Sequence, residues 1–284
     1  MIYNLYKQRG ETPLECIQRF AKANSELKGQ KMTYLGRLDP LAEGVLLMAS
    51  SDDVKRKEEF LALDKEYDFV SIFGFATDSY DILGKIMRVE KLPELLENDV
   101  RRVAMIYEGE REQKYPFYSS KEISSRKKHR PLEQPEYFSA EKSPHSPASR
   151  GPRVALKEDA SSSSPLQDLG DGVGGEVKKI NIYKIQFHKL ETLNNKELFG
   201  RLLMDISRVK GDFRQHEILI LWKEYLLNGG VGNYFLGKFS AYVSSGTYIR
   251  GLVNDIGNTL GCGATTLSIK RTRVGDYKLE DSII

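Results

Sequence analysis

The chain has 284 residues, 40% of them hydrophobic and 29% charged, which is ordinary for a soluble globular protein with a core large enough to need no disulfide or metal. A net charge of +3 is too small to indicate a nucleic-acid partner by itself. The first eleven residues lack the apolar stretch of a secretory signal, and the longest apolar runs, 45–49 and 218–222, are far shorter than a membrane span. We therefore expect a cytoplasmic protein that does not enter a membrane.

The first predicted element is an amphipathic helix of about 12 residues. Thr12 is typical of an N-cap, Pro13 of the first helical position, and Glu15 of a capping box. The apolar residues that we expect on one face are Leu14, Ile17, Phe20 and Ala21.

Four short stretches have the apolar character of β-strands. They are 45–48, 67–73, 180–187 and 238–243, and the second runs through Gly74 into a polar turn at 77–81.

The clearest periodic pattern follows the turn at 244–247, which we expect to cap a helix. Apolar residues recur there at helical spacing, and Gly261 ends the pattern; they are Ile249, Leu252, Val253, Ile256 and Leu260. Because strands and helices alternate irregularly, the sequence favours an α+β fold with a mixed, mostly antiparallel sheet flanked by helices.

The composition changes between residues 139 and 177. This stretch holds eight Ser, four Pro, five Gly and no aromatic residue, so it buries too little apolar surface to offset its ordering entropy. We predict a disordered insertion that separates two parts of one catalytic domain, 1–138 and 178–284.

Two cysteines, Cys16 and Cys262, form no CxxC pattern and stand at no zinc-ligand spacing from the four histidines. Both are predicted to be buried thiols, and no metal or cofactor is expected. Local basic clusters occur at 126–130 and 270–273, with a looser one at Arg208, Lys210 and Arg214.

Asp39 is a candidate reactive group. In Leu-Asp-Pro an aspartate is more often a turn residue than a catalyst, but Gly36 and Gly44 bracket this segment, and an apolar strand follows it. Glycines allow another backbone to approach closely, and a loop held by a buried strand is a common place for reactive groups.

The segment 34–46, Tyr-Leu-Gly-Arg-Leu-Asp-Pro-Leu-Ala-Glu-Gly-Val-Leu, resembles a signature of the TruB-type tRNA pseudouridine synthases. Further blocks follow in that family's order: Lys-Glu-Tyr at 65–67 with Thr-Asp-Ser-Tyr-Asp at 77–81, Pro-Phe-Tyr-Ser-Ser-Lys at 116–121, Ser-Gly-Thr-Tyr-Ile-Arg at 245–250, and the closing element at 264–277.

The resemblance implies a pseudouridine synthase fold and an isomerase that acts on the T-loop uridine, position 55, of tRNA. It implies that Asp39 attacks a flipped-out base, that Tyr67 stacks on the base and takes part in removing the C5 proton, and that Arg250 pairs with Asp39. An adjacent guanidinium would keep a buried carboxylate ionised. Tyr248 and Ile269 would line the base pocket.

The resemblance also implies RNA contacts at Asp81, for which turn capping is the alternative, and at Lys270 and Arg271, for which a solvated surface is the alternative. Tyr34 and Arg37 replace residues more usual in the family and would contact the RNA loop. The chain stops soon after Tyr277, so we expect no C-terminal RNA-binding domain of the PUA type, a monomer, and RNA binding by the catalytic domain alone.

Two other functions stay open from sequence. One is a guide-RNA-dependent synthase of the dyskerin type, which shares the Asp39 block. The other is a non-catalytic module that binds or folds RNA.

Overall fold

Most of the predicted elements belong to one long mixed sheet. The computed structural model describes residues 1–90, 95–114, 177–228 and 232–284, all of which fall in one compact unit of the chain. The strands are β1 Ile2–Lys7, β2 Met32–Leu35, β3 Ala42–Ser50, β4 Lys65–Phe73, β5 Phe75–Thr77, β6 Ile86–Val89, β7 Gly109–Lys114, β8 Val177–Asn194, β9 Asn233–Val243, β10 Ala264–Val274 and β11 Tyr277–Lys278. The α-helices are α1 Pro13–Ala23, α2 Lys57–Leu61, α3 Glu97–Ile106, α4 Asn195–Ser207, α5 Gln215–Lys223 and α6 Ile249–Thr259, with a π-helical turn at Glu224–Asn228.

Some sequence predictions fall outside these ranges. The predicted insertion lies outside the described residues except for Val177, which belongs to β8, and so do the Pro-Phe-Tyr-Ser-Ser-Lys block and the basic cluster at 126–130. Of the helices within the described ranges, none combines the length and apolarity needed to cross a bilayer.

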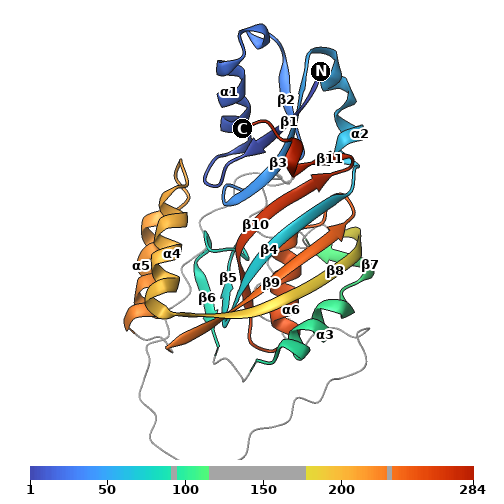
Figure 1. Cartoon of the computed structure of the whole chain (residues 1–284). Helices are drawn as coiled ribbons and strands as arrows, with labels where there is room; N and C mark the ends of the chain where they lie inside the picture. Colours follow the sequence, from blue (N-terminus) through green and yellow to red (C-terminus); the bar gives the residue numbers. More distant parts are fainter. Residues whose placement is uncertain (91–94, 115–176, 229–231) are drawn as a thin grey trace, which may run out of the picture. The chain divides into compact units, whose positions relative to one another are not determined.

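The main sheet has the order β1-β3-β10-β4-β9-β8-β7, and β2 and β11 pair with β3 and β10 (Figure 1). β3 and β10 run parallel, while the other pairs in this sheet are antiparallel. β5 and β6 form a separate two-stranded sheet. The predicted α+β fold with a mixed, mostly antiparallel sheet is therefore confirmed.

Helices cover both faces of the sheet where β4 ends. Phe73 packs in the cluster that holds α3 and α6, and its neighbour Ile72 packs in the cluster that holds α4 and α5. Because successive side chains of a strand point to opposite faces, both faces are buried at this end, whereas Asp68 nearer the start of β4 is exposed. The C-terminal end of β4 thus lies inside the protein, and Gly74 leads directly into β5.

The predicted strand at 180–187 is part of a longer one, β8. It starts at Val177 because it pairs with β7, opposite Lys114. Its buried residues change phase between Ile182 and Ile185, and the pairing with β9 shifts register at the same place. Tyr183 is the extra residue of this bulge, which explains why the apolar alternation skips one position.

The first helix has the predicted capping box: the Glu15 carboxylate accepts from the Thr12 amide at 2.8 Å. The predicted buried face is partly wrong, because Leu14 is 56% exposed and Cys16 is buried instead. α1 packs on β1 and β3 through Cys16, Ile17 and Phe20, and Leu14 lies roughly a third of a turn from the centre of that stripe. Both cysteines are buried and unpaired, as predicted.

α6 begins at Ile249 and ends just before Gly261, whose φ is +73°, so the predicted helix and its stop are confirmed. The predicted cap is wrong. The N-cap residue is Tyr248, and it makes no side-chain capping bond. The Ser244 and Thr247 hydroxyls bond within the preceding turn and to β8 instead.

Gly44 stands where β3 and β10 run side by side. Its φ is +105°, and a Cβ there would lie 2.2 Å from the carbonyl oxygen of Arg271. Gly36 has a φ of +99° but no backbone within contact range of that position, so it is needed for its conformation and not for close approach.

We predict that Gly44→Ala lowers the free energy of unfolding by about 3 kcal/mol or more, since the left-handed backbone and the clash with Arg271 both oppose a side chain. Denaturant titration measures this. Gly29→Ala is the matched control, because Gly29 has a φ of +80° and open space around its Cβ position, so only the backbone cost of about 1 to 2 kcal/mol applies. Equal losses in the two variants would contradict a packing role for Gly44.

Candidate active site

Asp39 lies on the loop between β2 and β3, which is held from both sides. Leu38 is buried in the cluster under α6, and Leu41 in the cluster under α4 and α5. The Lys7 ammonium lies beneath the loop and donates to the carbonyl oxygens of Pro40 at 3.2 Å and Ala42 at 2.6 Å. The Asp39 side chain between these attachments is 28% exposed, so its carboxylate is fixed in place and still reachable from solvent.

Arg250 meets this carboxylate from the first turn of α6. Its Nε lies 2.8 Å from Asp39 Oδ2 and its Nη2 lies 3.2 Å from Oδ1, so the pair is bidentate. The third nitrogen, Nη1, donates to the Ser79 carbonyl oxygen at 2.5 Å. The guanidinium is 4% exposed, and the described residues around it offer it three acceptors from two separate loops.

A second carboxylate, Asp81, lies 3.6 Å from Arg250 Nη1. Burial acts to lower the pKa of Arg250, but Asp39, Asp81 and the Tyr248 phenol outweigh it, so this pKa is raised above its ordinary value. Arg250 is therefore a permanent cation between two acids.

Asp81 caps the turn at 77–84. Its Oδ1 accepts from the Ser79 hydroxyl at 2.6 Å and from the Leu83 amide at 3.0 Å. Burial raises the pKa of Asp81, and Arg250 opposes that rise. The side chain lies inside the protein, and these contacts are those of the turn-capping alternative.

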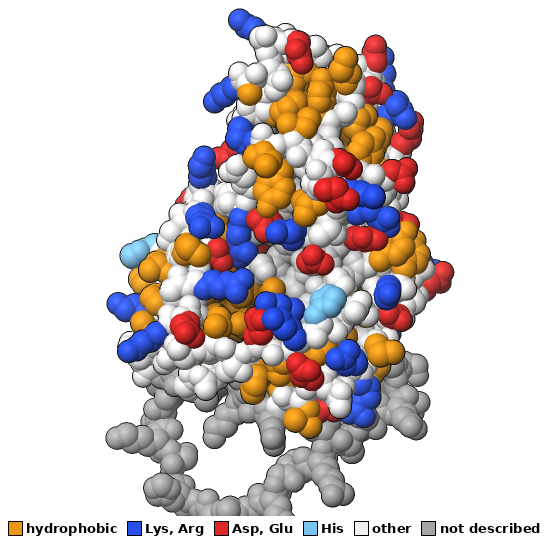
Figure 2. Space-filling model, in the orientation of Figure 1, with side chains coloured by type: hydrophobic (Ala, Val, Ile, Leu, Met, Phe, Trp, Pro, Cys, Tyr) orange, Lys and Arg blue, Asp and Glu red, His pale blue; other side chains and the backbone are white. Residues whose placement is uncertain are grey.

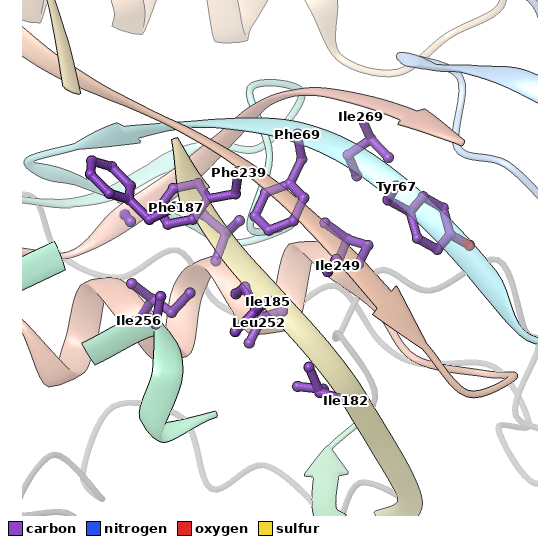
Figure 3. Close-up of a cluster of buried hydrophobic side chains, with 14 of the residues drawn as sticks. Tyr67, Phe69, Ile182, Ile185, Phe187, Phe239, Ile249, Leu252, Ile256 and Ile269 are labelled. Atoms are coloured by element: carbon purple, nitrogen blue, oxygen red, sulfur yellow. The ribbon is translucent and has the colours of Figure 1, made fainter. Parts of the chain in front are cut away.

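Tyr67 and Ile269, which the sequence assigns to the base site, share one cluster of buried residues with Leu38 and Ile249. These two are the neighbours in sequence of Asp39 and Arg250. Figure 3 shows Tyr67 at one end of this cluster, near Ile269 and Ile249, with its hydroxyl pointing away from the other labelled side chains. The cluster thus forms the hydrophobic environment next to the Asp39–Arg250 pair.

Tyr248 is half-buried and is held through its backbone. Gln113 on β7 accepts from the Tyr248 amide at 2.8 Å and donates to its carbonyl oxygen at 3.0 Å. Sequence reasoning missed Gln113, and the one available signal is weak: it is the one uncharged polar residue of β7.

Lys270 and Arg271 point to opposite faces of β10. Lys270 is 41% exposed and lies 3.5 Å from Glu43. Arg271 is 2% exposed and donates to the carbonyl oxygens of Val45 at 2.7 Å and Arg37 at 3.2 Å. Because successive side chains of a strand point to opposite faces, Lys270 keeps exposed surface for the predicted phosphate contact, whereas Arg271 is buried against backbone.

Tyr34 and Arg37, the two residues that depart from the family pattern, lie together. Arg37 is exposed, and its guanidinium carbon is 6.0 Å from the centre of the Tyr34 ring, which packs in part on the cluster under α1.

Sequence reasoning also missed Lys7. Its position is in phase with the buried Leu5 on β1, and burial lowers the pKa of Lys7 to about 8.

In the part of the chain that the structure describes, no three His, Cys, Asp or Glu side chains gather as metal ligands do. The site consists of a partly exposed carboxylate, a buried guanidinium and an adjoining apolar cluster. This arrangement suits a carboxylate nucleophile held in a fixed orientation beside an apolar pocket.

Residues 24–146 match a family model described as TruB family pseudouridylate synthase, N-terminal domain. The chain is 27% identical over 282 residues to a tRNA pseudouridine synthase B of Clostridium tetani, covering 99% of this chain and 70% of that protein. It is 27% identical to the same enzyme of Thermotoga petrophila, covering 98% and 64%, and 24% identical to that of Aquifex aeolicus, covering 98% and 69%.

The fold resembles two solved structures. One is a crystal structure of a Cbf5-Nop10-Gar1 complex, with a TM-score of 0.51 and 19% identity over 98% of this chain and 49% of that one. The other is an H/ACA RNP bound to a substrate RNA containing 2'-deoxyuridine, with a TM-score of 0.50 and 18% identity over 100% and 50%. This chain spans about half of each matched chain.

The match to the family model and the relatives named tRNA pseudouridine synthase B indicate a pseudouridine synthase, which is an isomerase. The chain is similar to the TruB family of pseudouridylate synthases, and its relatives named above are tRNA pseudouridine synthases.

A further carboxylate, Asp255, lies further along α6 than Arg250 and lines a pocket together with Tyr107 and Arg111. Burial raises the pKa of Asp255 to about 6, although Asn254 and Arg111 act to lower it. The folded protein therefore binds a proton that the unfolded chain has released between pH 3.8 and about 6. The free energy of unfolding falls as pH rises through this window. Above the window the full cost of burying the charged Asp255 carboxylate is present.

We predict that Asp255→Asn raises the free energy of unfolding by about 1 to 3 kcal/mol at pH 7.5 and leaves it nearly unchanged at pH 4. Denaturant titration at both pH values checks this. Asp276→Asn, at an exposed turn position, is the control and should show no such difference. A gain that is the same at both pH values would exclude burial of a charged Asp255 as its cause.

Proposed function

We propose that this protein converts the T-loop uridine at position 55 of tRNA to pseudouridine, with Asp39 as the catalytic carboxylate. The observation that carries the proposal is the bidentate hold of the buried Arg250 on a carboxylate that remains 28% exposed. The relatives named tRNA pseudouridine synthase B support tRNA as the substrate.

The reaction is an isomerisation and needs no oxidant, reductant or group donor. Asp39 attacks C1′ of the extruded nucleotide while the bond between C1′ and N1 of the base breaks. The base turns, and C5 bonds to C1′ as the bond between the Asp39 carboxylate and C1′ breaks, which frees the carboxylate. The proton on C5 then leaves, and N1 takes up a proton. Arg250 orients the Asp39 carboxylate before the attack.

A base taken out of its stack loses stacking energy of a few kcal/mol, and an aromatic side chain can replace it. We assign this role to Tyr67, whose ring lies in the cluster that adjoins the Asp39 loop. Its hydroxyl is our candidate for removal of the C5 proton, directly or through a water. Ile269 and Tyr248 would form the walls of the base pocket.

We assign the RNA contacts outside the pocket to Tyr34, Arg37 and Lys270, which keep exposed surface around the Asp39 loop. On the face drawn in Figure 2, Lys and Arg side chains alternate with Asp and Glu instead of gathering in one patch. The RNA would then be bound by a few individual Lys and Arg side chains and not by a continuous basic patch. We further propose that the protein acts as a monomer in the cytoplasm, with residues 139–177 inserted between two parts of one catalytic domain.

We predict that the wild type forms pseudouridine at one T-loop position of an unmodified tRNA transcript without guide RNA or partner proteins. Asp39→Asn should bind the same transcript with similar affinity and lose turnover by on the order of a thousandfold or more, since the nucleophile is removed. Chemical mapping of pseudouridine and a filter-binding assay measure the two quantities, with Asp276→Asn as the active control.

Equal product from the wild type and Asp39→Asn would remove Asp39 from the mechanism. Product that appears only when guide RNA is added would favour a guide-dependent synthase, and tight binding without product would favour a non-catalytic RNA-binding module.

We predict that tRNA affinity falls steeply with added salt, because phosphate contacts release bound counterions. Replacing both Arg37 and Lys270 with Ala should reduce the slope of log Kd against log salt by about 1.4 to 1.8, the value for two phosphate contacts. Lys22→Ala with Lys55→Ala, two exposed lysines of α1 and the segment after β3, is the control pair. A dissociation constant that stays constant over a tenfold range of ionic strength would refute phosphate-dominated binding.

A further inference from the structure

A helical hairpin, α4 with α5, connects two strands that are already neighbours. β8 and β9 pair up to Asn194 and Asn233, so the connection between them spans 195–232 where a short turn would join the strands. Figure 1 shows α4 and α5 next to the small sheet of β5 and β6. Leu198, Leu202 and Trp222 of the hairpin pack in one cluster with Phe75 and Ile82.

Three polar contacts join this hairpin to residues 77–85, which comprise the turn at 77–84 and the residue after it. Arg214 binds both oxygens of Asp78, at 3.0 Å and 3.5 Å. The indole N–H of Trp222 donates to the Ile82 carbonyl oxygen at 3.3 Å. Lys85, just after the turn, lies 2.6 Å from Glu217, but both side chains are more than a third exposed, so this pair is the weakest of the three.

Arg214 has a backbone conformation that is uncommon for a residue other than glycine. Its φ is +62° and ψ is +24°, at the position just before α5. The side chain is about one-third exposed, whereas its partner Asp78 is 15% exposed. With this backbone conformation, the Arg214 guanidinium reaches Asp78 in the turn at 77–84.

The other side of the same turn holds Arg250. Ser79, the neighbour of Asp78, accepts a hydrogen bond from Arg250 through its carbonyl oxygen, and Asp81 lies beside the same guanidinium. Asp78 Oδ1 also accepts from the Lys85 amide at 2.9 Å, which closes the turn. The turn is therefore placed between two arginines, one from the hairpin and one from the candidate active site.

We propose that Arg214 is a positioning residue for the pseudouridine-forming reaction, which acts through Asp78 and the Ser79 carbonyl to fix the orientation of Arg250 and hence of Asp39. The inference rests on the proposed function. A bidentate pair tolerates little displacement, and a misplacement of about 1 Å at a reacting group can cost roughly a hundredfold in rate. The hairpin would serve as the outer support of the turn that carries this geometry.

The test compares single-turnover rates of pseudouridine formation and tRNA dissociation constants for four variants. Arg214→Met removes the guanidinium, whose fork of N–H donors binds both Asp78 oxygens. Asp78→Asn removes the negative charge but keeps an oxygen that can accept from the Lys85 amide. The double variant completes a mutant cycle, and Arg201→Met, on α4 of the same hairpin, is the matched control.

We expect each single variant to lose about tenfold or more in rate with less than a twofold change in dissociation constant. The double variant should be no slower than the slower single one, because both changes break the same pair. The control should stay within twofold of the wild type.

Trp222 is the single tryptophan of the chain and is fully buried at this contact, so its emission reports whether the hairpin is still docked. If Arg214→Met shifts that emission to the red, the rates of Arg214→Lys and Asp78→Asn decide the test in its place. Arg214→Lys keeps the charge and loses the fork, and it should be slowed as well.

An active wild type with unslowed Arg214 and Asp78 variants would overturn this inference and leave the proposed function intact. Weaker tRNA binding at an unchanged rate would also overturn it, since Arg214 would then be an RNA contact. Additive losses in the double variant would do the same. A wild type that forms no pseudouridine would instead overturn the proposed function.

Discussion

The buried guanidinium of Arg250 is the interaction on which the candidate site depends. A cation with 4% of its side chain exposed has lost most of its hydration, which costs several kcal/mol unless acceptors replace the water. Asp39, Asp81 and the Ser79 carbonyl oxygen are those acceptors. They come from two loops that are far apart in sequence, so the same contacts that stabilise the charge also fix the loops relative to α6.

The surrounding scaffold limits the movement of the Asp39 loop. Gly44 lets β10 run against β3, and Arg271 reaches from β10 to the backbone of β3 and of the loop. Lys7 holds the loop from below. These are backbone contacts made by buried cations, and they hold the loop in addition to the Asp39–Arg250 pair.

Local patterns predicted the elements but not the contacts between them. The stripe from Ile249 to Leu260 and the Thr12–Glu15 capping box are short-range signals, and both correspond to real helices. The pairing of Asp39 with Arg250 spans 211 residues, and no spacing rule reaches that far, so only the family resemblance pointed to it. Arg271 and Asp81 were expected at the surface because they are charged, whereas both side chains are buried, Arg271 against backbone and Asp81 beside the buried Arg250. The hairpin of α4 and α5 gave no recognised signal, since its contacts with the turn at 77–84 are long-range.

The most direct test of the role of Arg250 is the single-turnover rate of Arg250→Lys on an unmodified tRNA transcript. Lysine keeps the charge but presents one ammonium in place of a planar fork, so it cannot bind both Asp39 oxygens and the Ser79 carbonyl at once. We predict a fall in rate of about a hundredfold or more, by analogy with the loss of one preorganised donor at a reacting group, with tRNA affinity nearly unchanged. A rate close to that of the wild type would show that the fork is not needed and would contradict the role assigned to Arg250.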